Sequence, residues 1–349
     1  MVPAGVAQLV ADGHEVFVEH GAGTGAGLFD QEYGAAGARV IGSSAEGYAC
    51  AELVVKVKEP QPEEYALLRN NQLIFGYFHF AASRSLTEAV MASGVTALAY
   101  ETLLDEEGRL PLLIPMSEVA GRMSVQQGAK LLENPSGGRG ILLGGVPGTA
   151  PAHVTILGAG VVGTEAAKMA AGLGATVHLL DTNIQRLRAL SEVLPRNVVV
   201  LASDRARILQ ELQIADLVIG AVLIRGALAP RLVTRADLKL MQKGSVIVDV
   251  AVDQGGCFES TRPTTHDAPS YVEEGIIHYC VANIPGAVSR TSTFALCNAT
   301  LPWVKRLAKQ GFPDLCKAVP TFRSALNIAG GQLFDRGVAE AFELPLVSF

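Results

Sequence analysis

Short apolar runs rich in β-branched residues alternate along the chain with longer segments of helical periodicity. In the first hundred residues, the apolar runs predict strands at residues 14–19, 39–41, 53–57, 73–77 and 95–100. The helical periodicity predicts helices over residues 2–12 and from Asp30, Ser44, Pro62 and Ser83. Because parallel neighbours need a crossover connection, this series predicts a mainly parallel sheet.

The same alternation resumes after a linker at residues 103–115 and a long helix at residues 117–133. Six further strands are predicted at residues 153–157, 176–180, 198–201, 216–220, 245–250 and 276–280. A helix over residues 292–310 is expected to return to the first domain, because the segment after it is too short to form a core.

A chain of 349 residues exceeds the usual size of a single core and suggests two domains. We therefore expect an α/β protein with two Rossmann-like, doubly wound parallel-sheet domains joined by long helices. The domain boundaries are predicted as residues 1–116 with 292–349, and residues 117–291.

The most informative segment is the strand 153–157 and the turn that follows it. Gly158, Gly160 and Gly163 form a G-x-G-x-x-G pattern that opens an Ala-rich helix, and Asp181 ends the next strand. In this context the glycines permit a tight turn and close approach to a pyrophosphate, and the acid binds the ribose of NAD. The alternative is a strand-turn-helix with only a structural role.

Composition excludes several other classes. A net charge of −6 and the lack of a basic cluster argue against nucleic acid as a partner. Residues 141–163 carry no formal charge and could span a bilayer by length, but the prolines and glycines there favour a loop leading into a buried strand. No membrane span or targeting segment is therefore expected.

The cysteines bear on the compartment and on metals. They are five in number and contain no C-x-x-C, at Cys50, Cys257, Cys280, Cys297 and Cys316. This pattern favours buried thiols in a reducing cytoplasm, with neither a disulfide framework nor a metal site.

Three polar clusters follow predicted strands, where open α/β sheets bind their ligands. Lys58 is a candidate for holding a substrate carbonyl or carboxylate, or else a solvated strand end. His79, between Phe78 and Phe80, is either catalytic or a buried core histidine. Asp253 is a candidate for proton transfer beside a nicotinamide.

Several longer motifs together resemble the bacterial alanine dehydrogenase family along nearly the whole chain. These motifs occupy residues 56–60, 100–102, 115–122, 138–140, 253–259, 262–265 and 279–283. The resemblance implies an enzyme acting on a CH–NH2 group, which oxidises L-alanine reversibly to pyruvate and ammonium with NAD, as a cytoplasmic homohexamer. The NAD-binding subunit of proton-translocating transhydrogenase is a more distant relative with a similar fold.

The resemblance also implies roles for individual residues. Lys58 would bind the pyruvate oxygens, His79 would be the acid/base, and Asp253 would handle protons of water and ammonia. Asp181 would bind the adenosine ribose. The rest of the cofactor site would be lined by Ser117, Gly158, Gly160, Gly163, Arg186, Ser203, Val222, Leu223, Val250, Asp253, Val281, Ala282, Asn283 and Ile284.

One departure from the family concerns the first residues, because residues 2–6 match the family just after its first strand and an arginine-bearing loop. The resemblance then implies a chain that binds NAD but turns over alanine poorly, unless Arg84, Arg122 or Arg290 holds the substrate carboxylate. Two alternatives to an active dehydrogenase are a non-catalytic or regulatory NAD-binding protein and a transhydrogenase-like NAD module.

Overall fold

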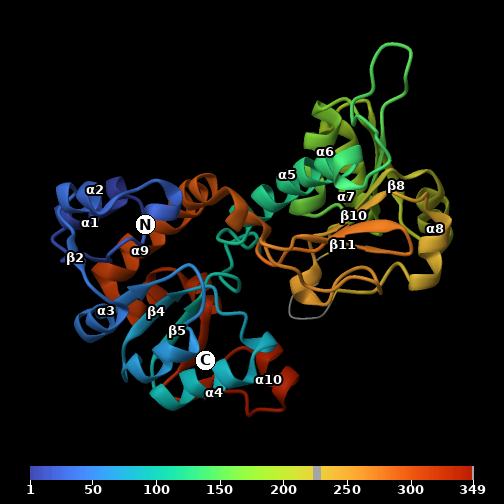
Figure 1. The fold of residues 1–349 in the computed structure, drawn as a ribbon. Coiled ribbons are helices and arrows are strands. Elements are labelled where there is room, and N and C mark those ends of the chain that lie inside the picture. The colour runs from blue at the N-terminus through green and yellow to red at the C-terminus, as the bar shows by residue number, and fades with distance from the viewer. Residues whose placement is uncertain (223–228, 348–349) are drawn as a thin grey trace. The chain divides into compact units, whose positions relative to one another are not determined.

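The computed structural model describes residues 1–222 and 229–347, which form two compact units (Figure 1). The first unit comprises Met1–Met116 and Val288–Phe349, and the second comprises Ser117–Ala287. The boundary lies within helix α5 (Ile114–Leu131), and the chain re-enters the first unit just before helix α9 (Ser289–Ala318).

The second unit is built on a seven-stranded sheet with the order β11-β12-β10-β9-β6-β7-β8. Its strands are β6 (His153–Leu157), β7 (Thr176–Asp181), β8 (Val198–Ala202), β9 (Leu217–Gly220), β10 (Val246–Asp249), β11 (Ser270–Glu273) and β12 (Ile276–Tyr279). All the pairings are parallel except that of β11 with β12. The strand order reverses between β6 and β9, which is where doubly wound sheets bind ligands.

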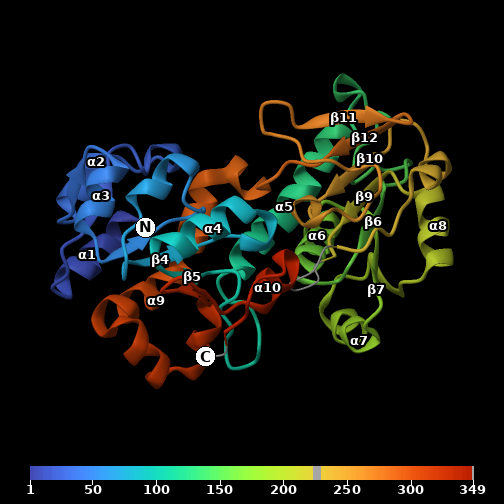
Figure 2. The same ribbon diagram turned by 90° about the horizontal axis from the view of Figure 1, so that it is seen from below.

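Helices cover both faces of this sheet. Figure 2 shows α5 and α6 on one side and α8 on the other. The helices after α5 are α6 (Val161–Gly172), α7 (Ile184–Val193) and α8 (Arg205–Ile214), with short 3-10 turns η4 (Asn134–Ser136), η5 (Arg235–Leu240), η6 (Val252–Gln254) and η7 (Ile284–Val288). The Asn183 and Asp204 side chains cap α7 and α8 by accepting hydrogen bonds from main-chain N–H groups of the first turn.

The first unit holds a five-stranded sheet with the order β14-β13-β5-β4-β3, and a separate parallel pair. The strands of the larger sheet are β3 (Leu53–Val55), β4 (Leu73–Gly76), β5 (Thr96–Ala99), β13 (Leu326–Ala329) and β14 (Gln332–Leu333). The separate pair consists of β1 (Phe17–Glu19) and β2 (Arg39–Ile41). Strands β3, β4 and β5 are parallel, whereas β13 and β14 are antiparallel additions.

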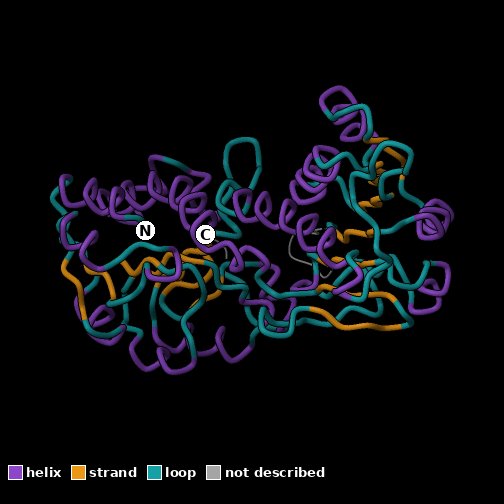
Figure 3. Tube along the Cα trace, turned by 45° about the horizontal axis from the view of Figure 1, so that its top comes forward, coloured by secondary structure: helices purple, strands orange, loops and turns teal. Residues whose placement is uncertain are grey.

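Helices lie on both sides of the strands in this unit (Figure 3). They are α1 (Pro3–Ala11), α2 (Asp30–Ala35), α3 (Ser44–Cys50), α4 (Arg84–Ser93), α9 and α10 (Arg336–Phe342), with 3-10 turns η1 (Thr24–Ala26), η2 (Pro62–Leu67), η3 (Phe80–Ala82) and η8 (Pro320–Ala325). Phe75 and Tyr100 pack edge to face in the core, with ring centroids 4.4 Å apart, and Phe322 packs on Phe75. This packing joins the returning segment to the parallel strands.

The predicted α/β class with Rossmann-like parallel sheets is confirmed. Three strands were not predicted. Strand β11 is short and half polar, and β13 and β14 lie in the segment after the returning helix, for which the sequence predicted no strand. Within the described residues, none of the helices is sufficiently long and apolar to cross a membrane. Residues 141–152 form a loop that leads into β6, as predicted.

Candidate functional site

In the second unit, the turn after β6 requires glycine at two of its three fingerprint positions. Gly158 has a φ of +103°, a region that side chains other than glycine rarely adopt. A Cβ at Gly163 would lie 1.8 Å from the main-chain oxygen of Gly158, so helix α6 can approach the turn only without a side chain there. These contacts explain the strand-turn-helix geometry that the pattern predicted.

Gly160 differs, because a Cβ placed there would meet nothing within 4 Å. It is the N-cap of α6, and no side chain caps the free N–H groups of that helix end. Helix N-termini of this kind bind phosphate through main-chain N–H groups and the helix dipole. The turn therefore has both the space and the donors that the pyrophosphate of a dinucleotide needs.

Asp181 ends β7 beside this turn, where its carboxylate is held by the main chain. Its Oδ2 accepts a hydrogen bond from Ala159 N at 2.7 Å, and its Oδ1 accepts one from Asn183 N at 2.8 Å. Arg186 Nη1 lies 4.0 Å from Oδ2, and Ser203 N donates to the main-chain oxygen of Asp181. The structure thus brings Asp181, Arg186 and Ser203 to one end of the sheet, next to the glycine turn.

The strand β10 leads into a loop whose two aspartates have different environments. Asp249 is buried and accepts hydrogen bonds from Thr261 Oγ1 at 2.6 Å, Cys257 N at 3.0 Å and Ala251 N at 3.1 Å. Burial raises the pKa of Asp249 to about 6, although these hydrogen bonds favour the ionised form. Asp253 lies exposed on η6, so it is the aspartate available to a ligand.

The remaining predicted cofactor residues of this unit are dispersed over the same part of the sheet and over α5. Asn283 N lies 3.5 Å from Asp253 Oδ2, and Asn283 has a left-handed φ of +62°. Val250 N donates to Gly220 O at the end of β9. Ile284 and Val281 are buried, Ala282, Val222 and Ser117 are half-buried, and Leu223 lies outside the described residues.

In the first unit, three side chains follow the carboxyl ends of the successive parallel strands β3, β4 and β5. They are Lys58, His79 and Glu101. Because the carboxyl ends of parallel strands lie at one edge of a sheet, the topology gathers these residues at that edge. Glu101 belongs to the motif at residues 100–102, and its place directly after a predicted strand is the signal in the sequence that could have identified it.

His79 is exposed, and its backbone is in the left-handed region at φ +50° and ψ +43°. Its main-chain N–H donates to Glu101 Oε1 at 2.7 Å, and Phe78 N donates to the same oxygen at 3.0 Å. The imidazole is parallel to the ring of Tyr77, with centroids 6.0 Å apart. The alternative of a buried core histidine is wrong, since only the flanking Phe78 and Phe80 are buried.

Lys58 is also exposed, with Nζ 3.9 Å from Glu59 Oε2. The predicted strand at residues 53–57 ends at Val55 in the structure, so Lys58 lies in the loop beyond the strand. Lys56 instead forms an ion pair with Glu64. Both interpretations of Lys58, a substrate ligand and a solvated lysine, are compatible with this position.

Two carboxylates near these residues in sequence have unsatisfied oxygens. Glu59 Oε2 and Glu101 Oε2 are buried and accept no hydrogen bond from the described residues. Buried oxygens without a donor are unfavourable, so these atoms are suited to contact a polar group from outside the chain. This observation favours a polar ligand at the edge where β3 and β5 end.

The three arginines considered as substitutes for a carboxylate clamp are all engaged in other contacts. Arg122 donates twice to Glu165, and Arg84 pairs with Glu88 one helical turn away. Arg290 donates to the main-chain oxygens of residues 26 and 27. Recruiting any of them to a substrate would require breaking these contacts.

The sheet order, the glycine turn and Asp181 define the class: an α/β protein with a Rossmann-like dinucleotide-binding unit. Profiles of the alanine dehydrogenase/PNT N-terminal and C-terminal domains match residues 1–120 and 124–336. The chain belongs to the alanine dehydrogenase/PNT family, which confirms the resemblance found in the sequence.

Individual relatives give the same result. The chain is 52% identical over 347 residues to the alanine dehydrogenase of Halomonas elongata, covering 99% of this chain and 94% of that protein. A solved L-alanine dehydrogenase is 51% identical, with a TM-score of 0.93 and coverage of 98% of this chain and 94% of that one. A transhydrogenase from Sinorhizobium meliloti, at 24% identity and a TM-score of 0.80 over 95% of this chain and 94% of that one, shares the fold.

Proposed function

We propose that this protein is an alanine dehydrogenase that converts L-alanine, NAD and water reversibly into pyruvate, ammonium, NADH and a proton. The observation that carries the proposal is an identity of about 50% to alanine dehydrogenases along nearly the whole chain. The family implies a nicotinamide cofactor. NAD itself is inferred from Asp181, whose carboxylate beside the glycine turn suits two ribose hydroxyls better than a phosphate.

The alternatives are less well supported. A transhydrogenase-like module would match the fold, but that relative is only 24% identical, against 51% for the solved alanine dehydrogenase. A non-catalytic NAD-binding protein would not need an exposed histidine and lysine at the edge where β3 and β4 end. This chain has both, and both are exposed.

In the proposed reaction, NAD held by the second unit would supply the acceptor for the hydride of the alanine α-carbon. The chain's own side chains bind the substrate and move protons. Lys58 holds the carboxylate or carbonyl oxygen by a charge-assisted hydrogen bond. His79 exchanges protons with the nitrogen or oxygen bonded to the reacting carbon, and Asp253 handles protons of water and ammonia. Glu101 positions His79 by accepting the main-chain N–H of that residue.

The dinucleotide is held by the second unit. The main chain at residues 158–163 binds the pyrophosphate, and Asp181 binds the adenosine ribose, with Arg186 and Ser203 beside it. Ser117, Val222, Leu223, Val250 and residues 281–284 contact the remainder of the cofactor. Each of these assignments is a proposal from position in the family and in the sheet.

The assembly and compartment are also proposals. The family resemblance implies a hexamer of 36.6 kDa chains, which light scattering on the purified protein can test. All five cysteines are free thiols, and burial raises the pKa of Cys257 and Cys280 to about 12, so these two are unreactive. Free thiols support a cytoplasmic location.

The decisive experiment is an assay of NADH formation with L-alanine at alkaline pH. We expect turnover with NAD and L-alanine, little with NADP, and the reverse reaction with pyruvate, ammonium and NADH. Glycine and L-serine serve as control substrates. Tight NADH binding without turnover in either direction would instead support the non-catalytic alternative.

A further inference from the structure

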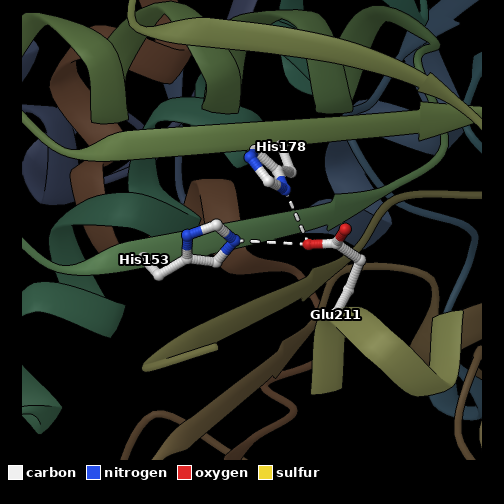
Figure 4. A group of neighbouring side chains, drawn as sticks. All are labelled: His153, His178 and Glu211. Carbon is white, nitrogen blue, oxygen red and sulfur yellow. Dashed lines mark hydrogen bonds and ion pairs between the residues drawn. The ribbon is translucent and has the colours of Figure 1, made fainter. Parts of the chain in front are cut away.

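The second unit contains a cluster of two histidines and a glutamate outside the site described above (Figure 4). Glu211 Oε2 lies 2.7 Å from His178 Nδ1 and 3.3 Å from His153 Nε2. All three ligand atoms lie within 4.8 Å of one another. The two imidazole rings are nearly perpendicular, and one nitrogen of each lies near the same carboxylate oxygen.

Register and helix packing bring these residues together. His178 on β7 is paired with Thr155 on β6, and His153 lies two residues before Thr155. Because side chains alternate along strands, all three project from one face of the sheet. Helix α8 covers that face and supplies Glu211, so the cluster ties two strands to a helix.

The cluster is largely shielded from water. The side chain of Glu211 is 3% exposed, and those of His153 and His178 are 15% and 21% exposed. Thr155 is fully buried on the same face, and its hydroxyl has no hydrogen-bond partner among the described residues. A buried carboxylate between two imidazoles, next to an unsatisfied hydroxyl, provides donor atoms for an ion and for one water molecule.

We propose that His153, His178 and Glu211 form a zinc site whose fourth ligand is a water hydrogen-bonded to Thr155. Two imidazole nitrogens and one carboxylate oxygen are a donor set that Zn²⁺ uses. With bonds of about 2.0–2.2 Å in a tetrahedral arrangement, ligand atoms lie roughly 3.3 Å apart, which the His153–Glu211 pair already matches. The shorter His178–Glu211 distance must lengthen when the ion enters.

The neighbouring charges permit a divalent ion. Arg207 Nη1 lies 3.8 Å from the other oxygen, Oε1, of Glu211 and is half exposed. The nearby Asp216 accepts the main-chain N–H of His153 and pairs with Arg139. Asp216 is already neutralised by Arg139, so within the described residues the one uncompensated charge beyond the ligands is that of Arg207, which is half exposed and therefore screened by solvent.

The position of the cluster in the sheet predicts a structural role for the ion. His153 is the first residue of β6, whereas the dinucleotide turn follows the last, which puts the cluster about 15 Å away at the opposite end of the strand. The ion would fasten α8 to β6 and β7. No His/Cys spacing signals this site, since its ligands come from three separate elements.

The test is zinc binding to the full-length, chelator-treated protein. We expect calorimetry to show one Zn²⁺ per chain, Co²⁺ to give visible bands of tetrahedral geometry, and saturating zinc to raise the melting temperature by about 5 °C. His178→Ala and Glu211→Gln should each abolish that binding. His20→Ala, which removes an exposed histidine paired with Asp30, should leave it unchanged.

Several results would overturn the proposal. One is an absence of stoichiometric binding to the wild type. Another is equal binding by the wild type and the His178→Ala variant, or cobalt bands typical of sulfur ligands, which would place the ion on cysteines. If the variants do not fold, as judged by circular dichroism, anomalous scattering from zinc-soaked wild-type crystals decides whether the ion lies between the three side chains. None of these readouts depends on dehydrogenase activity.

Discussion

The candidate sites of the two units differ in what they are made of. In the second unit, the dinucleotide turn consists of main chain, shaped by glycines that lie close together in sequence. In the first unit, Lys58, His79 and Glu101 are side chains brought together by the order of three strands. A main-chain site is sensitive to any added Cβ, whereas a side-chain site is sensitive to removal of a functional group.

Because of this difference, substitutions in the two units should have separable effects on stability and on the reaction. Glycine substitutions should damage the turn through the fold or through the approach of the cofactor, depending on what the new Cβ meets. Removing an exposed side chain such as His79 should leave the fold intact and affect only the reaction. Six substitutions, at His79, Asp253, Gly163, Gly160, His278 and Asp181, test this comparison.

The largest effect is expected for His79→Ala. Loss of a general acid/base lowers kcat by about a thousandfold, while NADH still binds because the dinucleotide turn lies in the other unit. Asp253→Ala should lower kcat to a similar extent, and NADH should still bind because Asp253, on η6, is not expected to hold the adenosine half of the dinucleotide. Steady-state rates and NADH fluorescence titrations measure the two quantities, with His20→Ala as the control. Parallel loss of NADH binding and of folding would show that these residues are structural.

Paired alanine substitutions in the turn come next. Gly163→Ala forces a Cβ onto the Gly158 oxygen and should lower the free energy of unfolding by about 3 kcal/mol. Gly160→Ala meets open space, so stability should change by less than about 0.5 kcal/mol while NADH binding weakens at least tenfold. Denaturant unfolding and NADH titration separate the two. Equal losses of stability in the two variants would contradict this account of the turn.

The dinucleotide turn is made of main chain, which does not titrate. The pH dependence of the stability of the second unit should therefore come from buried groups in its sheet. Burial lowers the pKa of His278 from 6.5 to about 4, so its contribution to stability is present above pH 6.5 and is lost as the pH falls toward 4. Asp249 acts oppositely: its pKa rises from 3.8 to about 6, so stability is lost as the pH rises through that window. In the wild type the two contributions offset each other between pH 4 and 6.

His278→Gln should remove one of these contributions and expose the other. Relative to the variant, the free energy of unfolding of the wild type should rise by about 3 kcal/mol from pH 4 to 6.5, at 1.36 kcal/mol per pKa unit. Hydrogen exchange of the buried strands β10 and β12 measures it. A difference that stays constant with pH would show that His278 does not titrate as its burial indicates. Asp249→Asn is the matched control, for which the difference in stability should change with pH in the opposite direction.

The smallest effect concerns cofactor choice. A 2′-phosphate would lie against the Asp181 carboxylate, so we expect NAD to bind at least roughly tenfold more tightly than NADP, or about 1.4 kcal/mol. Asp181→Ala should narrow this gap, because Arg186, 4.0 Å from the carboxylate, becomes free to meet the phosphate. Fluorescence titration with both cofactors checks it. Equal affinities in the wild type would rule out this role for Asp181.

Much of the fold and part of the site could be predicted from local patterns. The strands of the parallel sheets, the glycine turn and the acid at the end of β7 each depend on neighbouring residues whose periodicity or conformation is visible in the chain. The antiparallel strands β11, β13 and β14 could not be predicted, because short, half-polar segments become strands only when a sheet edge is available.

The sequence by itself determined the dinucleotide turn, since three glycines, a strand and a helix N-terminus act within a few residues of one another. Only the tertiary structure decided that Asp249 is buried while Asp253 is exposed, that Glu101 holds the main chain of His79, and that His153, His178 and Glu211 converge. These contacts join residues far apart in the chain. They depend on strand order, register and helix packing, which arise from burial of the whole apolar core and not from any local pattern.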